Sequence, residues 1–366
     1  MNFIDNSNKE LYIKGFYISF IILLIIIIIY YVYSKINLLQ SNCDTLTKIY
    51  NSNPTINCIP DNMLDRPLRD FYIKTAYNCC ATGKFYADFV GLCALQTCIQ
   101  QGVRCLDFEI YSIDNEPVIA VSPNDNFTSK ESFNSIPIAD AFKMIKQLAF
   151  NNTACQNYTD PLLLHFRIFS KNVPMYTNLT NQIKTILSSN VLDSNYSYEY
   201  NSGNLGAVSI RNFINKIIII VDTTNPLYRS TPLDEYVNIG SSTPFMRLLR
   251  YDDVKYTQDL LFKEFNKKNM SIVLPNRSYK NSNPNFLISS SYGCQLIGMS
   301  FQNYDSNLEH YNFLFDSNKT AFLVKPPELC YIPTTIKEPE KAPISYSYAS
   351  RSISTNKSNS YYNYSI

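Results

Sequence analysis

The hydrophobic pattern begins with one long apolar run near the N-terminus, followed by a series of much shorter runs. The long run covers residues 15–33, GFYISFIILLIIIIIYYVY, and contains no charged side chain. At about 1.5 Å per residue, a helix of this length spans roughly 28 Å, close to the thickness of the hydrocarbon core of a bilayer. Tyrosines at both ends of the run are typical of the membrane–water interface. We therefore predict a retained, single-pass membrane span.

A cleaved signal peptide and a buried core helix are the alternatives for this run. The run is longer than the apolar region of a typical signal peptide, and no small-residue cleavage site follows it. Lys9 and Lys14 precede the run, and Lys35 and Lys48 follow it. Because lysines flank both ends, the charge pattern leans only weakly towards a cytoplasmic N-terminus. The side of the membrane on which the rest of the chain lies stays open.

Short apolar runs that alternate with helical patterns begin at residue 71. Strand-like runs at 71–76 and 103–110 flank a helical segment at about 91–101, and a third run at 117–121 follows a turn. Later strand patterns lie at 160–167, 216–222 and 270–275, and helical patterns lie at 138–150 and 252–266. This alternation predicts an α/β fold with a parallel sheet and crossover helices. The chemistry of such folds lies at the carboxyl ends of the strands.

Composition narrows the function classes. The formal net charge of +2 gives no electrostatic footprint for a nucleic acid, so we expect no nucleic-acid partner. The chain has 10 cysteines, too few for a disulfide framework at this length, and we expect most of them to be packed core thiols. The 2 histidines lack zinc-ligand spacing to the cysteines, so no zinc site is expected.

Three motifs near the first strands resemble the X region of eukaryotic phosphoinositide-specific phospholipase C. They are TAYN at 75–78, GVRCLDFE at 102–109 and EPVIAVS at 116–122. The family has Ser-His-Asn-Thr, then Gly-x-Arg-x-(Leu/Val)-Glu-Leu-Asp, then Glu-Pro-Val-(Ile/Val)-x-His-Gly, in the same order. FTSK at 127–130 and DPLLLHFR at 160–167 resemble the family's next two elements.

A second resemblance, to the Y region of the same family, covers the C-terminal part of the chain. It rests on Asn-Pro at 283–284, GCQLIGMSFQN at 293–303 and TAFLVKP at 320–326. The two resemblances together imply a TIM-type (β/α)8-like barrel of the phospholipase C-like phosphodiesterase kind, preceded by one transmembrane helix. The expected segments are a polar leader (1–14), the span (15–33), a stalk (34–66), an X-like half-barrel (67–190), a connecting region (191–250), a Y-like half-barrel (251–333) and a disordered tail (334–366).

The family resemblance also implies a site, and several of its chemical groups are changed here. The family's two catalytic histidines correspond to Tyr77 and Val121. A valine cannot transfer a proton, and a tyrosine with a pKa of about 10 is a poor base at neutral pH. The family's lysines that bind substrate phosphates fall at residues 220–222, and its phosphate-binding arginine falls at Ile272.

The family's calcium ligands correspond to Asn78, Asp107, Glu109 and Arg167. The first three keep an amide or a carboxylate, whereas the fourth, a glutamate in the family, is an arginine here. We expect the four side chains to meet at the barrel mouth, with Arg167 paired to a carboxylate in place of the metal. No calcium and no other cofactor are therefore expected.

We interpret the sequence as a membrane-anchored, catalytically inactive relative of this lipid-signalling family. Its expected partners are the lipid bilayer and a phospholipid headgroup or a protein. One alternative is an active phosphodiesterase with an altered, calcium-independent site that uses His165 or Tyr77. Another is a structural or virion-type membrane protein whose barrel is only a scaffold. Glycosylation sequons such as those at Asn126 and Asn178 arise often in an asparagine-rich chain and do not decide the orientation.

Overall fold

Parallel strands form the wall of a nearly closed barrel. The computed structural model describes residues 3–52, 54–124, 129–279, 282–333 and 346. Neighbouring strands are hydrogen-bonded in the order β7-β6-β5-β2-β1-β10-β9-β8, and each of these pairings is parallel. Their bounds are β1 Phe71–Ala76, β2 Cys105–Ile113, β5 Leu162–Ile168, β6 Ile217–Asp222, β7 Ile239–Ser241, β8 Met246–Arg250, β9 Met270–Leu274 and β10 Leu296–Met299. The predicted fold class is confirmed.

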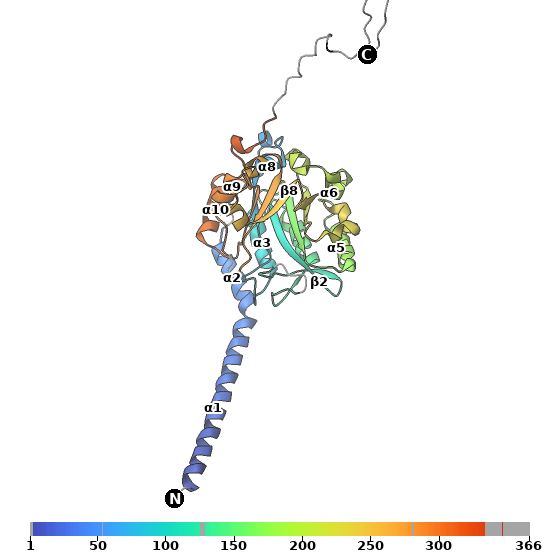
Figure 1. Ribbon diagram of the computed structural model, residues 1–366. Coiled ribbons are helices and arrows are strands. Elements are labelled where there is room, and N and C mark those ends of the chain that lie inside the picture. Colours follow the sequence, from blue (N-terminus) through green and yellow to red (C-terminus); the bar gives the residue numbers. More distant parts are fainter. Residues whose placement is uncertain (1–2, 53, 125–128, 280–281, 334–345, 347–366) are drawn as a thin grey trace, which may run out of the picture. The chain divides into compact units, whose positions relative to one another are not determined.

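Helices alternate with the barrel strands along the chain and surround them (Figure 1). Their bounds are α3 Leu92–Gln100, α4 Ile138–Leu148, α5 Val173–Ile186, α6 Ser197–Ser202, α7 Tyr251–Lys255, α8 Phe262–Lys268, α9 Phe286–Ser291 and α10 Ser306–Ser317. Three short strands are antiparallel additions: β3 (Glu116–Ile119) pairs with β2 and β4 (Ile136–Pro137), and β11 (Phe322–Val324) pairs with β1.

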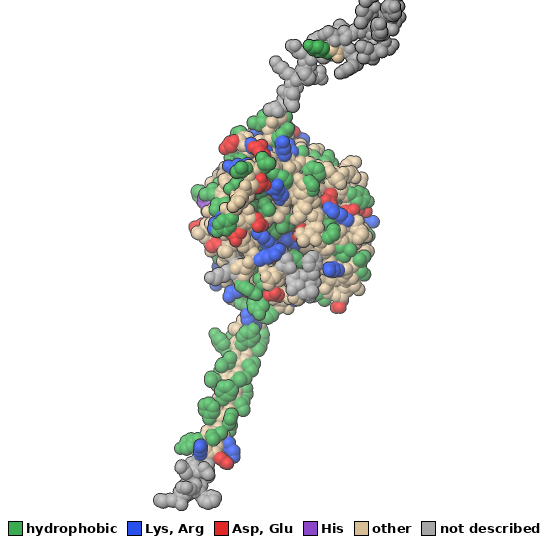
Figure 2. All heavy atoms as spheres, in the orientation of Figure 1, with side chains coloured by type: hydrophobic (Ala, Val, Ile, Leu, Met, Phe, Trp, Pro, Cys, Tyr) green, Lys and Arg blue, Asp and Glu red, His purple; other side chains and the backbone are tan. Residues whose placement is uncertain are grey.

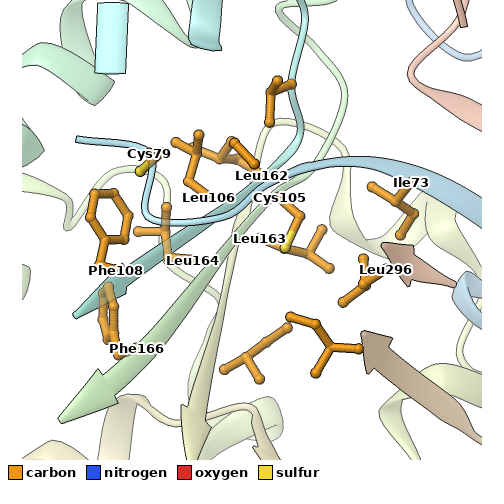
Figure 3. Close-up of a cluster of buried hydrophobic side chains, with 14 of the residues drawn as sticks. Ile73, Cys79, Cys105, Leu106, Phe108, Leu162, Leu163, Leu164, Phe166 and Leu296 are labelled. Atoms are coloured by element: carbon orange, nitrogen blue, oxygen red, sulfur yellow. The ribbon is translucent and has the colours of Figure 1, made fainter. Parts of the chain in front are cut away.

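The register between β2 and β5 decides which side chains enter the barrel. Phe108 lies beside Phe166, and Phe166 in turn packs on Phe142 of α4, so this set faces the helices. Figure 3 shows Phe108 and Phe166 with other buried apolar side chains of these strands. Because side chains alternate along a strand, the intervening residues of β2 and β5 point to the opposite side. Polar groups of these two strands therefore face the barrel interior.

Helix α1 (Phe3–Ile36) contains the predicted span. Within residues 9–36, the most apolar 18-residue window has a mean hydropathy of 2.7, and none of that window is buried in the structure. Figure 2 shows apolar side chains along this helix, with charged side chains near its N-terminal end. The helix is long and apolar enough to cross a membrane, as the sequence predicts for residues 15–33.

Residues 34–66 differ from the predicted polar stalk. They include α2 (Leu38–Ile49), which lies against α3, and Leu46, Ile56 and Ile59 are buried. The sequence pattern did not predict this packing because residues 34–66 are mostly polar. A few apolar side chains on one face are enough to hold a helix against a barrel. Cys43 of α2 forms a disulfide with Cys93 of α3, a pairing that the sequence analysis does not predict.

Two further differences lie in the C-terminal half. The connecting region 191–250 contains three barrel strands, β6, β7 and β8, whereas the sequence predicts only one strand there, at 216–222. The helix predicted at 252–266 is divided into α7 and α8. The predicted tail, 334–366, lies outside the described residues apart from residue 346.

Candidate functional site

Four polar side chains form a buried cluster at the carboxyl ends of β1, β2 and β5. Asp107 and Glu109 come from β2, Arg167 from β5, and Asn78 follows β1. The parallel register places Glu109 directly beside Arg167. All four residues are at most 2% exposed. The structure thus brings the four positions implied by the family resemblance into one place.

The guanidinium of Arg167 lies at the centre of this cluster. Its Nε and Nη2 donate to the two oxygens of Asp107 at 3.0 and 2.8 Å. Its Nη1 donates to Oε1 of Glu109 at 2.9 Å, and Nη2 also donates to Oδ1 of Asn78 at 2.7 Å. The Asn78 amide nitrogen donates to the same Glu109 oxygen at 3.0 Å. Two carboxylates and one amide oxygen therefore share a single cation.

The charges of the cluster set its protonation states. Burial alone would raise the pKa of Asp107, but the Arg167 charge and the hydrogen bonds from His165 and Arg167 hold that pKa well below its usual range. Burial alone would lower the pKa of Arg167, but the charge of Asp107 and that of Glu109 raise it well above its ordinary value. Asp107 and Arg167 are consequently both charged at neutral pH.

This donor set does not fit calcium. Ca²⁺ takes six to eight oxygen ligands, whereas the oxygens of Asp107 and Oε1 of Glu109 already accept hydrogen bonds from Arg167. The other Glu109 oxygen accepts from the Ser122 backbone N–H at 2.9 Å and from the Tyr111 hydroxyl at 3.2 Å. A fixed guanidinium charge would also repel a divalent cation at this distance.

Tyr77 and Val121, the positions of the family's histidines, contribute no group for proton transfer. The Tyr77 ring lies against the Arg167 guanidinium, 4.8 Å from ring centroid to Cζ, and its hydroxyl accepts from Nη1 of Arg250 at 3.3 Å. Burial raises the pKa of Tyr77 above its ordinary value of 10.0. Val121 is 1% exposed and apolar. Tyr77 therefore covers the ion pairs and holds its proton at neutral pH.

A hydrogen-bonded chain of Asp107, His165 and Ser241 extends the cluster towards β7. Nδ1 of His165 lies 2.7 Å from Oδ1 of Asp107, and its Nε2 lies 3.1 Å from Oγ of Ser241. The residue types and their order match a Ser-His-Asp triad, but all three are 0% exposed. The sequence analysis missed Ser241 because it recognised no strand between residues 223 and 250. No pattern in that stretch distinguishes it.

An open cavity of about 710 Å³ lies next to the cluster. Its lining includes Tyr111 and Phe169, whose rings are 5.6 Å apart, and the two lysines Lys130 and Lys171. Tyr111 also contacts Glu109 through its hydroxyl, and the Phe169 ring lies 5.9 Å from the Arg167 guanidinium. The two aromatic rings thus contact both the cavity and the buried ion pairs.

Comparison with known proteins agrees with the resemblance in the X region. Residues 64–222 match the model of the phosphatidylinositol-specific phospholipase C X domain. A curated relative is the 1-phosphatidylinositol 4,5-bisphosphate phosphodiesterase 1 of Saccharomyces cerevisiae, 26% identical over 107 residues, which are 29% of this chain and 11% of that protein. The family match ends with β6, so the assignment of residues 251–333 as a Y-like half remains a prediction.

Solved structures share the fold. The crystal structure of PLC21 from S. officinalis superposes with a TM-score of 0.57 at 16% identity, covering 75% of this chain and 39% of the other. PLC21 from L. pealei gives 0.56 at 17% identity, covering 74% and 39%. The chain spans well under half of the length of these proteins. The shared fold and the family match over residues 64–222 together relate this part of the chain to the X domain of the phosphatidylinositol-specific phospholipases C.

Proposed function

We propose that this protein is a membrane-anchored, catalytically inactive phospholipase C-like barrel that acts by binding rather than by hydrolysis. The observation that carries the proposal is the position of Arg167, whose guanidinium binds Asn78, Asp107 and Glu109 together. These are the positions that hold calcium in the family that the sequence resembles. The ion pairs replace the metal with a side chain that is part of the fold.

Two losses act together against hydrolysis. General acid–base catalysis contributes typically 10²- to 10⁴-fold to a rate, and a metal ion would add stabilisation of the charge that develops on the phosphate. Tyr77 and Val121 cannot supply the first, and the Arg167 ion pairs do not leave the oxygens needed for the second. Restoring one without the other would leave the reaction slow.

The direct test measures calcium binding and hydrolysis on the full-length protein in detergent. Calorimetry with CaCl₂ should show no binding heat, and phosphatidylinositol and its 4,5-bisphosphate should not be cleaved with or without calcium. Arg167→Glu restores a carboxylate at the fourth ligand position and should gain calcium affinity without gaining activity, because Tyr77 and Val121 remain. Tight calcium binding by the wild type, or calcium-stimulated release of inositol phosphate, would reject the proposal.

A calcium-independent phosphodiesterase is a second candidate, and the Asp107–His165–Ser241 chain is the observation that favours it. Hydrolysis in the presence of EDTA that is lost in Ser241→Ala would establish this activity. The complete burial of the three residues argues against it, because a substrate phosphate could not reach His165 or Ser241 without a rearrangement of the barrel. We expect neither the wild type nor the variant to hydrolyse the substrate.

Binding of a phospholipid headgroup at the barrel mouth can be tested separately from the loss of hydrolysis. Inositol phosphates added to the full-length protein should raise its unfolding temperature if the barrel mouth binds a phospholipid headgroup. An unchanged unfolding temperature would favour a protein partner, or the scaffold role of a structural membrane protein. The same titration with inorganic phosphate distinguishes recognition of the inositol from binding of any anion.

A further inference from the structure

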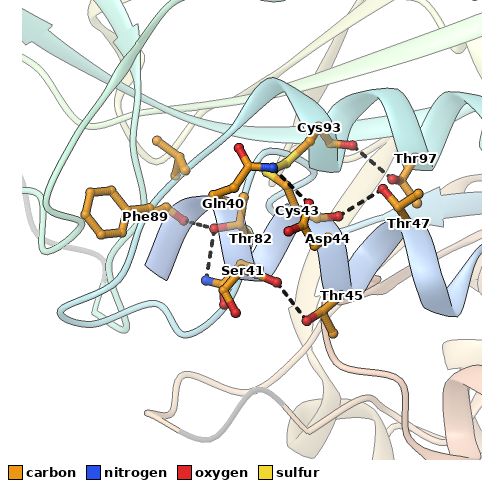
Figure 4. Close-up of a disulfide and its surroundings, with 12 residues drawn as sticks. Gln40, Ser41, Cys43, Asp44, Thr45, Thr47, Thr82, Phe89, Cys93 and Thr97 are labelled. Atoms are coloured by element: carbon orange, nitrogen blue, oxygen red, sulfur yellow. Dashed lines mark hydrogen bonds between the residues drawn. A yellow bond between two sulfur atoms is a disulfide. The ribbon is translucent and has the colours of Figure 1, made fainter. Parts of the chain in front are cut away.

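A disulfide joins the barrel to the segment that directly follows the predicted span. Cys43 lies on α2 and Cys93 on α3, with their Cα atoms 5.8 Å apart (Figure 4). Threonines one turn later donate to the two cysteine carbonyls, Thr47 at 3.0 Å and Thr97 at 2.9 Å. Asn42 adds a bond to Asp88 at 2.9 Å. The pairing is therefore supported by the packing of both helices.

The disulfide indicates which side of the membrane the barrel occupies. Both cysteines are half-buried, so a cellular reductant could reach the bond. Disulfides persist in the secretory lumen, outside the cell and on virion surfaces, and are rare in the reducing cytosol. The other described cysteines are buried except Cys58 and Cys330, which are half-buried, so no described free thiol is fully exposed. This distribution suits an oxidising environment.

Among the residues that the structure describes, three glycosylation sequons on this same side of the span carry an exposed asparagine. They begin at Asn151, Asn195 and Asn318. At Asn151 the side-chain oxygen accepts from the backbone N–H and the hydroxyl of Thr153, at 3.0 and 2.8 Å, so the two residues that define the sequon are already in contact. Asn318 follows the last turn of α10.

Other sequons on the described surface are held in the fold. Asn157 is 0% exposed, and its amide donates to the Gly102 carbonyl at 3.1 Å. Asn178 is half-buried, and its amide donates to the Asn115 carbonyl at 3.0 Å and to Glu116 at 3.2 Å. The sequon at Asn126 lies outside the described residues. The candidate acceptors differ from Asn157 and Asn178 in exposure: even Asn318, whose amide donates to the Leu314 carbonyl at 2.8 Å, is exposed.

We infer that the barrel lies on the oxidising face of the membrane and that Asn151, Asn195 and Asn318 are N-glycan acceptors. The transfer joins the asparagine Nδ2 to C1 of a lipid-linked oligosaccharide and breaks the C1–O bond to the polyisoprenyl diphosphate, which leaves as one amide proton is released. Nδ2 keeps its second hydrogen. The inference rests on the membrane anchor of the proposed function, but not on the inactivity of the site.

The experiment is translation of the full-length chain in the presence of microsomes. Wild-type protein should migrate as a ladder that an N-glycosidase collapses, and Asn151→Gln, Asn195→Gln and Asn318→Gln should each remove one step. Thr153→Ala should remove the same step as Asn151→Gln, whereas Thr153→Ser, which keeps the sequon, should retain it. This matched pair separates loss of the acceptor from a general folding defect.

Protease added to intact microsomes gives an independent measure of topology. The barrel should be protected, and a maleimide reagent should label two more thiols after reduction in the wild type than in the Cys43→Ser, Cys93→Ser variant. A digested, glycan-free barrel would overturn the inference even if the disulfide forms. A protected barrel without glycans would overturn the three acceptors. Release of the protein by alkaline carbonate would instead count against the anchor itself.

Discussion

Two arginines are almost completely buried in this barrel, and their partners differ. Arg167 lies at the carboxyl end of β5 and shares its charge with Asp107 and Glu109. Arg104 precedes β2 at the opposite end of the barrel and donates to neutral acceptors, the Ala149 carbonyl, the Cys155 sulfur and the Asn157 amide oxygen. In barrels of this kind the carboxyl ends of the strands carry chemistry and the other end carries stability.

The carboxyl groups near the two arginines differ in their pKa values. The pKa of Asp107 lies well below its usual range, whereas burial raises the pKa of Asp160 to about 6, an effect that the charge of Arg104 offsets only in part. One arginine is neutralised by direct ion pairs and the other is only near a carboxyl group. A buried cation by itself therefore does not indicate a replaced metal, and our proposal for Arg167 rests on its direct contacts with Asn78, Asp107 and Glu109.

Removal of Arg167 should have the largest effect. Arg167→Met leaves Asp107 and Glu109 buried without their cation, and breaking a buried ion pair in this way costs about 3–5 kcal/mol. Urea unfolding of the full-length protein in detergent at pH 7 measures the loss. The deficit should shrink at acidic pH, because the variant's carboxyl groups take up protons more readily. If Arg167→Met lost less unfolding free energy than Arg104→Met, direct ion pairing would not be what distinguishes the two arginines.

The pH dependence of Asp160 should come next. Its folded-state pKa of about 6 lies above the ordinary value of 3.8, so the stability that the protonated form provides is lost as the pH rises from about 4 to 6. A shift of this size corresponds to about 3 kcal/mol. Asp160→Asn should therefore become more stable relative to the wild type by up to about that amount between pH 4 and pH 7, as urea unfolding at each pH would show.

The contribution of Asp107 to stability has the opposite pH dependence to that of Asp160. Its lowered pKa provides stability above pH 3.8, and this stability is lost as the pH falls through the lower folded-state value. Both the wild type and Asp160→Asn contain Asp107. Its contribution therefore cancels in the difference between their free energies of unfolding. A difference that stays flat from pH 4 to pH 7 would show that Asp160 has an ordinary pKa.

Removal of Arg104 should have a moderate effect. Arg104→Met loses hydrogen bonds to neutral acceptors and leaves no carboxylate in direct contact without its partner, so we expect a loss of about 1–3 kcal/mol. The same urea series measures it. Calcium should not change the stability of this variant, whereas it should stabilise Arg167→Glu, in which three carboxylates face one another.

An exposed arginine should show the smallest effect. Arg211 pairs with Asp65 at 2.7 Å, but both side chains are largely exposed, at 51% and 78%. Solvent screens such pairs, and many contribute nothing measurable. Arg211→Met should unfold at the wild-type urea concentration within error. A clear shift would show that the differences above do not arise from burial.

Much of the fold could be predicted from the sequence, and the errors have identifiable causes. Continuous apolar runs gave β1, β6 and β9 nearly to the residue. Strands β7 and β8 were missed because they are short and contain glycine, serine and arginine, which weaken the strand pattern. Helix α2 was missed because residues 34–66 are mostly polar.

The site shows the same division. Asn78, Asp107, Glu109 and Arg167 could be placed together because the family resemblance aligned them with one set of ligands and because parallel strands end at one mouth. Ser241 could not be placed at the site from the sequence, because its strand was not recognised and its contact with His165 depends on barrel closure. The disulfide could not be predicted either, since it requires α2 to lie on α3, a contact between segments 50 residues apart.

The disulfide also decides how a mechanical load would pass through the molecule. A pulling force between α1 and a partner bound by the C-terminal part of the chain enters at Cys43 and crosses the sulfur–sulfur bond directly to Cys93. The chain between them, which includes β1 and Asn78, forms a closed covalent loop and lies outside the path of tension. Tension on α1 would therefore be transmitted to α3 first. Strand β1, which precedes Asn78 of the Arg167 cluster, would not carry it.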